Sequence, residues 1–310
     1  MKALVRATVG RDGVNYLVTN HIPRRLATRA MGWFSRVEQP LVVRLSLAIW
    51  RAAAGDALRL DEAERTDFRS IHDCFTRTLK PGARPIDPRP GVAVSPCDGI
   101  VVAAGRIADT TLVQAKGFTY TLDDLLQDPV LAARCRDGSY VTLRLTSTMY
   151  HRFHAPDDGR VTTVCHVPGD AWNVNPPALA RVPRLYCRNE RVIIPIAQGT
   201  APPSLVLVPV GAILVGSVHL HFARLTRRRQ GRRIRHVRCD AVFRRGEELG
   251  YFHHGSTIIV IAPPGLEPVP GIVAGARLRV GQPLLQQAPH QAPLSVGGGV
   301  ASSSSHAPAM

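Results

Sequence analysis

The sequence is poor in lysine and contains no closely spaced cysteine pair. Only three of the 39 basic residues are lysines, so arginine supplies nearly all of the excess over the 23 acidic residues and the formal charge of +16. The six cysteines are scattered and never form a CxxC pair, which argues against a zinc ribbon or a disulfide-rich secreted scaffold. Reduced thiols are therefore expected.

Long apolar runs are also missing. The longest apolar window, residues 205–220, is interrupted by Pro209, Gly211, Gly216 and His219, so it is too broken to predict a transmembrane helix. The first 18 residues lack the apolar core of a signal peptide. These features predict a soluble or peripheral protein, and the arginine excess favours nucleic acid, acidic lipid or a phosphorylated substrate as partner.

Two amphipathic helices are predicted between residues 23 and 60, with Pro40 between them. Their apolar positions are Leu26, Ala30, Trp33, Phe34, Leu41, Leu45, Ala48 and Ile49. The arginines among them are Arg24, Arg25, Arg29, Arg36, Arg44 and Arg51, opposed only by Glu38. This pattern suits either helices lying in the headgroup region of an anionic bilayer or helices packed on the main domain with a solvated basic face.

After Lys80, short β-branched runs separated by Gly, Pro and Asp predict a mainly antiparallel β domain, interrupted by a helix at 121–135. The arginine cluster at 224–238 resembles a basic loop, and it lacks aromatic residues that could stack on bases. We expect an α+β fold with amphipathic helices at 1–70, a β-rich domain at 71–285 and, from its Ser, Gly, Pro and Ala content, a disordered tail at 286–310.

Asp98 in SPCDG, His154 in YHRFHAP and Ser256 in HHGST are the residue types of a catalytic triad. In a triad, a carboxylate orients an imidazole, which removes the proton of the serine hydroxyl. Ser256 does not stand in a G-x-S-x-G motif, so ordinary acyl hydrolysis is not favoured.

Neighbouring histidines invite a metal hypothesis. The pairs are His151 and His154, His219 and His221, and His253 and His254. Because no supporting pattern of acidic residues or cysteines accompanies them, the sequence predicts no metal site.

Eight segments together resemble the phosphatidylserine decarboxylase family. In chain order they are FTRTLKPGARPID (75–87), SPCDG (95–99), QAKGFTYTLDDLL (114–126), YHRFHAP (150–156), VPGDAWNVNPPAL (167–179), RNERV (188–192), VGAILVGSV (210–218) and GEELGYFHHGST (246–257). They follow the family's order and cover most of residues 70 to 262.

The resemblance implies a self-processing enzyme that makes its own cofactor. In that family a serine attacks the carbonyl of the preceding glycine, the ester breaks by β-elimination, and the new N-terminal residue becomes a pyruvoyl group. The matching bond is Gly255–Ser256, which would give a heterodimer of a β chain (1–255) and an α chain (256–310). The pyruvoyl ketone then delocalises the carbanion left when CO2 departs, as pyridoxal phosphate does elsewhere.

The resemblance also implies roles for single residues. By motif position, Asp98 and His154 would activate Ser256 for self-cleavage, with the carboxylate fixing the tautomer of the imidazole. His151 would serve as an acid or base during decarboxylation. Two positions depart from the family pattern, namely Cys97 in place of alanine and His254 in place of leucine before the scissile pair.

The implied substrate is phosphatidylserine, which would be converted to phosphatidylethanolamine and CO2. The N-terminal helices would then face lipid, through Trp33, Phe34, Arg24, Arg25 and Arg29, at the cytoplasmic side of the cell membrane. A homodimer of the processed chains is possible, and no nucleic-acid partner is expected. Two alternatives stay open: another amino-acid-bearing substrate on the same fold, and a basic nucleic-acid-binding protein that never cleaves.

Overall fold

The computed structural model describes residues 24–115, 118–199, 201, 203–212, 218–225, 233–253 and 256–288. His254 and Gly255, at the predicted cleavage site, lie outside these ranges, as do residues 226–232 of the arginine cluster and the chain after residue 288. The side chains of Arg24 and Arg25 are likewise not described.

The two predicted N-terminal helices are confirmed as α3 (Arg24–Phe34) and α4 (Pro40–Ala54). Pro40 is the first residue of α4, where its missing N–H costs nothing, and the side chain of Gln39 accepts a hydrogen bond from the Val42 amide as the N-cap. Two 3-10 turns, η1 (Gly55–Leu58) and η2 (Leu60–Glu62), and the short helix α5 (Ile71–Phe75) complete this region.

One face of α4 forms a small hydrophobic core with the segment that follows. The members of this core are Val43, Leu47, Ala63, Phe68 and Cys74, with Trp50 and Leu60 packed against it. Other large apolar residues of the two helices are exposed, namely Leu26, Trp33, Phe34, Leu41, Leu45 and Ile49. The N-terminal helices therefore leave a large apolar surface exposed after packing on the rest of the chain.

The rest of the described chain is mainly antiparallel sheet, as predicted. An eight-stranded sheet has the order β11 (Arg235–Phe243), β7 (Gly159–Val167), β8 (Arg191–Ala197), β9 (Pro203–Val210), β13 (Thr257–Ala262), β5 (Ser139–Arg144), β2 (Gly99–Arg106) and β15 (Arg277–Leu278). Its central strand β13 is buried along its full length, which explains the unbroken apolar run TIIVIA.

Three smaller sheets flank the large one. They are β1 (Val92–Val94) with β16 (Pro283–Gln287) and β14 (Leu266–Pro268), then β10 (Val218–Leu220) with β12 (Glu248–Phe252) and β6 (Arg152–His154), and the pair β3 (Thr111–Ala115) with β4 (Phe118–Thr121). Strand β16 continues to Gln287, so the first two residues of the predicted tail are in a sheet.

The single helix expected at 121–135 is two helices, α6 (Leu122–Leu126) and α7 (Pro129–Arg134). Gln127 adopts a left-handed conformation with φ of 54°, and the carboxylate of Asp128 accepts hydrogen bonds from the first amides of α7. Gln127 thus ends the first helix, and the Asp128–Pro129 pair starts the next, because the residue before a proline disfavours helical geometry. Short helices α8 (Pro176–Leu179) and α9 (Leu185–Arg188) follow later.

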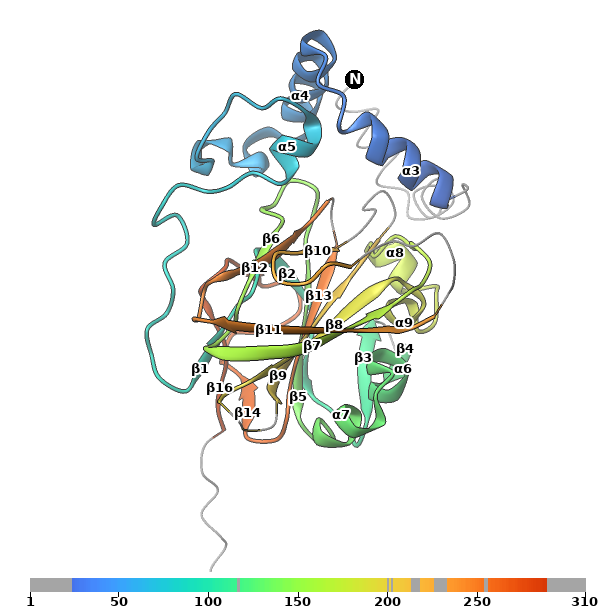
Figure 1. The fold of residues 1–310 in the computed structure, drawn as a ribbon, viewed down its shortest axis with the longest axis vertical. Helices are drawn as coiled ribbons and strands as arrows, with labels where there is room; N and C mark the ends of the chain where they lie inside the picture. The colour runs from blue at the N-terminus through green and yellow to red at the C-terminus, as the bar shows by residue number, and fades with distance from the viewer. Residues whose placement is uncertain are drawn as a thin grey trace, which may run out of the picture.

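Figure 1 shows α3, α4 and α5 at one end of the molecule, beside the end of the sheets where β6, β10 and β13 lie. A buried arginine joins the two parts, since the Arg77 guanidinium donates to the carbonyls of Leu58 and Thr148 at 3.0 and 3.3 Å. The helical region is thus anchored to the β domain beside the segment that carries YHRFHAP.

Candidate active site

Ser256 lies at the entrance of the central strand β13. Its side chain is fully buried, and its carbonyl accepts a hydrogen bond of 2.8 Å from the Leu145 amide at the end of β5. The next residue, Thr257, pairs with Arg144 on β5 and with Val210 on β9. In the part of the chain that the structure describes, the Ser256 hydroxyl has no hydrogen-bond partner. A buried hydroxyl without a partner is costly in a structural role, which favours a chemical role.

Asp98 is held by a buried arginine. Its two carboxylate oxygens accept hydrogen bonds from the Arg84 guanidinium at 2.9 and 2.6 Å, and one of them also accepts from the Val280 amide at 3.0 Å. Arg84 reaches Glu62 on η2 at 2.8 Å as well. Asp98 is therefore at one end of an ion-pair network that extends through Arg84 and Glu62 into the N-terminal region.

His154 lies on β6, next to the turn that holds Asp98, because its amide donates to the Pro96 carbonyl at 2.8 Å. Its Nδ1 is 2.8 Å from the Gly246 carbonyl, and since a carbonyl can only accept, Nδ1 carries the proton. The Nε2 atom is then the basic nitrogen, and it accepts from the Tyr150 hydroxyl at 3.1 Å. Burial lowers the pKa of His154 below its ordinary value, so the ring is kept neutral.

The predicted contact between Asp98 and His154 is not formed in this structure. Among the residues described, no hydrogen bond joins Asp98, His154 and Ser256 to one another, and the carbonyl of Gly246 fixes the His154 tautomer instead of a carboxylate. The physical reason is that Arg84 offers the Asp98 carboxylate a two-pronged, charge-assisted hydrogen bond, which a neutral imidazole cannot match.

His151 is fully buried three residues before His154. The centroid of its ring lies 4.4 Å from that of Phe75 on α5, and Phe75 in turn stacks on Trp50 of α4 at 5.0 Å. The His151 carbonyl accepts from the Phe252 amide at 2.9 Å, which fixes the end of β12 just before the predicted cleavage residues.

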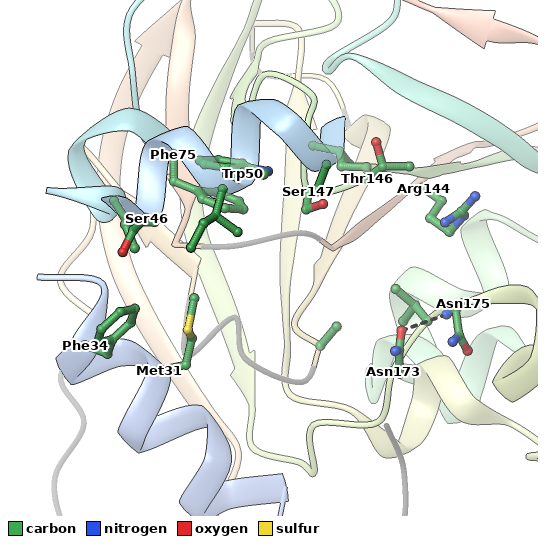
Figure 2. A pocket seen from close by; sticks show the side chains of 16 residues that line it. Met31, Phe34, Ser46, Trp50, Phe75, Arg144, Thr146, Ser147, Asn173 and Asn175 are labelled. Atoms are coloured by element: carbon green, nitrogen blue, oxygen red, sulfur yellow. Dashed lines mark hydrogen bonds between the residues drawn. The ribbon is translucent and has the colours of Figure 1, made fainter. Parts of the chain in front are cut away.

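A pocket of about 780 Å³ lies between the N-terminal helices and the end of the large sheet. Its walls come from α3, α4 and α5, from residues 144–147 at the end of β5, from residues 173–175 and from Ala212. Two of the lining residues touch the reactive ones, because Phe75 packs on His151 and the Leu145 amide binds the Ser256 carbonyl. Ser256 and His151 are thus separated from the pocket only by the residues that line it. Figure 2 shows the side chains of these lining residues.

Sequence reasoning missed several residues that now belong to the site. Arg84 and Tyr150 lie inside two of the quoted motifs, but nothing in their spacing indicated that they bind Asp98 and His154. Arg144, which lines the pocket, stands outside every quoted segment. A buried Asp implies a buried cation nearby, and that is the one signal that could have pointed to Arg84.

Comparison with known proteins identifies the family of the chain. Residues 71–286 match the family described as Phosphatidylserine decarboxylase. Phosphatidylserine decarboxylase proenzymes of Halorhodospira halophila and of Anaeromyxobacter sp. strain K are each 38% identical to the chain, over 85% of it and over 90% and 94% of their own lengths. The proenzyme of Dickeya dadantii is 33% identical over 89% of the chain and 93% of its own length. The chain therefore belongs to the phosphatidylserine decarboxylase family.

Proposed function

We propose that this chain is a self-processing phosphatidylserine decarboxylase in which Ser256 becomes the pyruvoyl group. The observation that carries the proposal is the position of Ser256, a buried serine with a hydroxyl lacking a described partner, directly behind a large pocket. Ser256 also lies within the residues that match the family, in the segment that resembles its cleavage motif. The test is decarboxylation of phosphatidylserine vesicles by the purified chain, compared with free serine. Release of CO2 from the vesicles but not from free serine would support a lipid substrate.

Self-cleavage requires that the Ser256 hydroxyl lose its proton as it attacks the carbonyl carbon of Gly255. The peptide C–N bond then gives way to an ester, and the proton is returned to the freed amine of Ser256. His154 is the proposed base, acting through Nε2, because Nδ1 is committed to the Gly246 carbonyl. For this, Nε2 must exchange the Tyr150 hydroxyl for that of Ser256.

The residues around Ser256 fit a pyruvoyl group there, because the buried side chain lies behind the pocket wall formed by Leu145 and is not hydrogen-bonded to another described group. The group supplies a ketone that condenses with the substrate amine and delocalises the carbanion formed on loss of CO2. His151, buried against Phe75 behind the same wall, is the proposed group that delivers a proton to the substrate carbon after CO2 has left.

Asp98 has a proposed role in processing that its buried ion pair makes testable. Asp98→Asn removes the charge that Arg84 binds, so we expect slower cleavage and a loss of about 3 kcal/mol of unfolding free energy, as for other broken buried pairs. Asp240→Asn is the matched control, since Asp240 forms an exposed pair with Arg160. Gel analysis measures the rate of cleavage, and thermal denaturation measures the loss of stability. Normal processing of Asp98→Asn would contradict the role.

The N-terminal helices are the proposed membrane-binding surface. None of the described helices has both the length and the apolar character needed to cross a bilayer. Instead α3 and α4 expose Trp33, Leu41 and Leu45 to 74%, 71% and 64%, and Arg29 and Arg44 are exposed on the same helices. Exposed apolar residues flanked by arginines favour shallow insertion into an anionic leaflet. We assign this leaflet to the cytoplasmic face, because cytoplasmic leaflets carry the anionic lipid.

Replacing Trp33 and Leu41 together by alanine is expected to weaken binding to anionic vesicles by roughly tenfold to a hundredfold, from the apolar area withdrawn from lipid. Val242→Ala is the matched control, because Val242 is 70% exposed on the edge strand β11, in a different part of the fold. Vesicle co-sedimentation measures the difference. If the double variant bound as tightly as the control, these helices would not be the docking surface.

A further inference from the structure

The pocket behind which Ser256 lies has one apolar side and one polar side. Phe34, Met31, Phe75 and Trp50 gather on the first, whereas Arg144 lies on the second with Asn173 and Asn175, as Figure 2 shows. Such a division suits an amphiphile with a hydrocarbon part and an anionic part.

Arg144 is the only basic side chain that lines this pocket within the described chain. It is half-buried, and none of the described carboxylates forms an ion pair with it. By contrast, Arg84 is matched by Asp98 and Arg245 by Asp157, and the buried guanidinium groups of Arg77 and Arg191 donate to backbone carbonyls. Burial lowers the pKa of Arg144, because the charged guanidinium is partly removed from water.

The position of Arg144 relates it directly to the reacting residue. Arg144 is the last residue of β5 and pairs with Thr257 of β13, the residue that follows Ser256. Residues paired across antiparallel strands have Cα atoms about 5 Å apart, so the long arginine side chain starts close to the site of chemistry. Arg144 and Leu145 therefore form the part of the pocket wall that lies at the strand end where Ser256 is held.

We propose that Arg144 binds the phosphodiester of the lipid substrate and thereby sets the position of the headgroup in the pocket. This inference rests on the proposed function and adds a residue to it. The guanidinium offers a planar fork of donors that matches two phosphate oxygens, and Asn173 and Asn175 line the same side.

The phosphate is a better partner for Arg144 than the substrate carboxylate, which is the other anion of the headgroup. The carboxylate must lose its charge as CO2 leaves, so an arginine bound to it would stabilise the ground state more than the transition state. The charge of the phosphodiester is the same before and after the reaction. Binding it stabilises substrate, transition state and product alike.

The decisive experiment measures lipid binding rather than turnover. The full chain with Ser256→Ala, which retains the pocket without processing, is titrated calorimetrically with short-chain phosphatidylserine, phosphatidylethanolamine and diacylglycerol. Adding Arg144→Gln is expected to weaken binding of both phospholipids by roughly tenfold or more, as for a lost charge-assisted hydrogen bond, and to leave diacylglycerol unchanged. Arg144→Lys should recover part of the loss, because it keeps the charge but not the fork.

Arg106→Gln is the matched control, since it removes one positive charge from the exposed end of β2 and should change none of the three affinities. Weakened binding of phosphatidylserine alone would assign Arg144 to the carboxylate and overturn the proposal. Equal weakening of all three lipids, or of none, would overturn it too. In the processed enzyme, Arg144→Gln should raise KM with little change in kcat. A wild-type chain that processes but does not decarboxylate phosphatidylserine would instead contradict the proposed function.

Discussion

Ser256→Ala is expected to leave the chain whole at 310 residues, whereas the wild type is expected to separate into chains of 255 and 55 residues. The substitution removes the only atom that can attack the Gly255 carbonyl, so both processing and decarboxylation should fall below detection. Intact mass spectrometry distinguishes the two forms directly. The small chain of the wild type should also resist N-terminal sequencing and react with a ketone reagent.

The matched control is Ser204→Ala, which alters another serine of the large sheet, on β9. Ser204 donates to the Ile196 carbonyl in a structural role, so this variant should process normally. Cleavage of Ser256→Ala at residue 255, or a wild-type chain that never cleaves, would contradict self-cleavage by Ser256.

Replacing the two histidines of YHRFHAP is expected to impair different steps, namely self-cleavage for His154 and decarboxylation for His151. His154→Ala removes the proposed base and should slow self-cleavage by about a hundredfold or more, the usual contribution of a positioned base. His151→Ala should still cleave, but its decarboxylation rate should fall by a similar factor. Gel analysis gives the first rate and release of CO2 from the processed fraction gives the second. If His151→Ala stayed whole, the division of roles would be wrong.

The rate of cleavage should also depend on pH in a defined direction. Burial lowers the pKa of His154, so its neutral, proton-accepting form persists below the ordinary value of 6.5. We therefore expect a constant rate from about pH 8 to about pH 6.5, and a decline only at more acidic pH, where Nε2 becomes protonated. Precursor made by cell-free synthesis and shifted between buffers allows the measurement. A decline beginning near neutral pH would show that another group is the base.

The sequence predicts the elements of this fold better than the contacts of its site. Apolar spacing on either side of Pro40 predicts α3 and α4, because side chains on one helix face recur every three to four residues. The run 121–135 also looks helical throughout, yet a left-handed Gln127 and the cap formed by Asp128 divide it. Local backbone geometry of this kind is decided by single residues, which an averaged pattern conceals.

The site residues are proposed from the resemblance, whereas their partners depend on distant parts of the chain. Asp98 is bound by Arg84 and by the amide of Val280, which is 182 residues away, and His154 by the carbonyl of Gly246, which is 92 residues away. By analogy with a catalytic triad, the sequence predicts only that Asp98 pairs with His154. It does not show that Arg84 competes for the Asp98 carboxylate, because the two are brought together only by folding.

The pocket shares walls with the exposed face of the N-terminal helices, and this affects the energy of substrate capture. Phe34 and Ile49 both line the pocket and are 38% and 56% exposed on that face. Pulling a lipid into water costs about 0.8 kcal/mol for each CH2 group, so complete extraction of one long acyl chain exceeds 10 kcal/mol. On the proposed membrane orientation, the acyl chains would pass from bilayer to protein across a continuous apolar surface. Only the headgroup would need to rise, and most of the lipid could stay in the leaflet throughout the reaction.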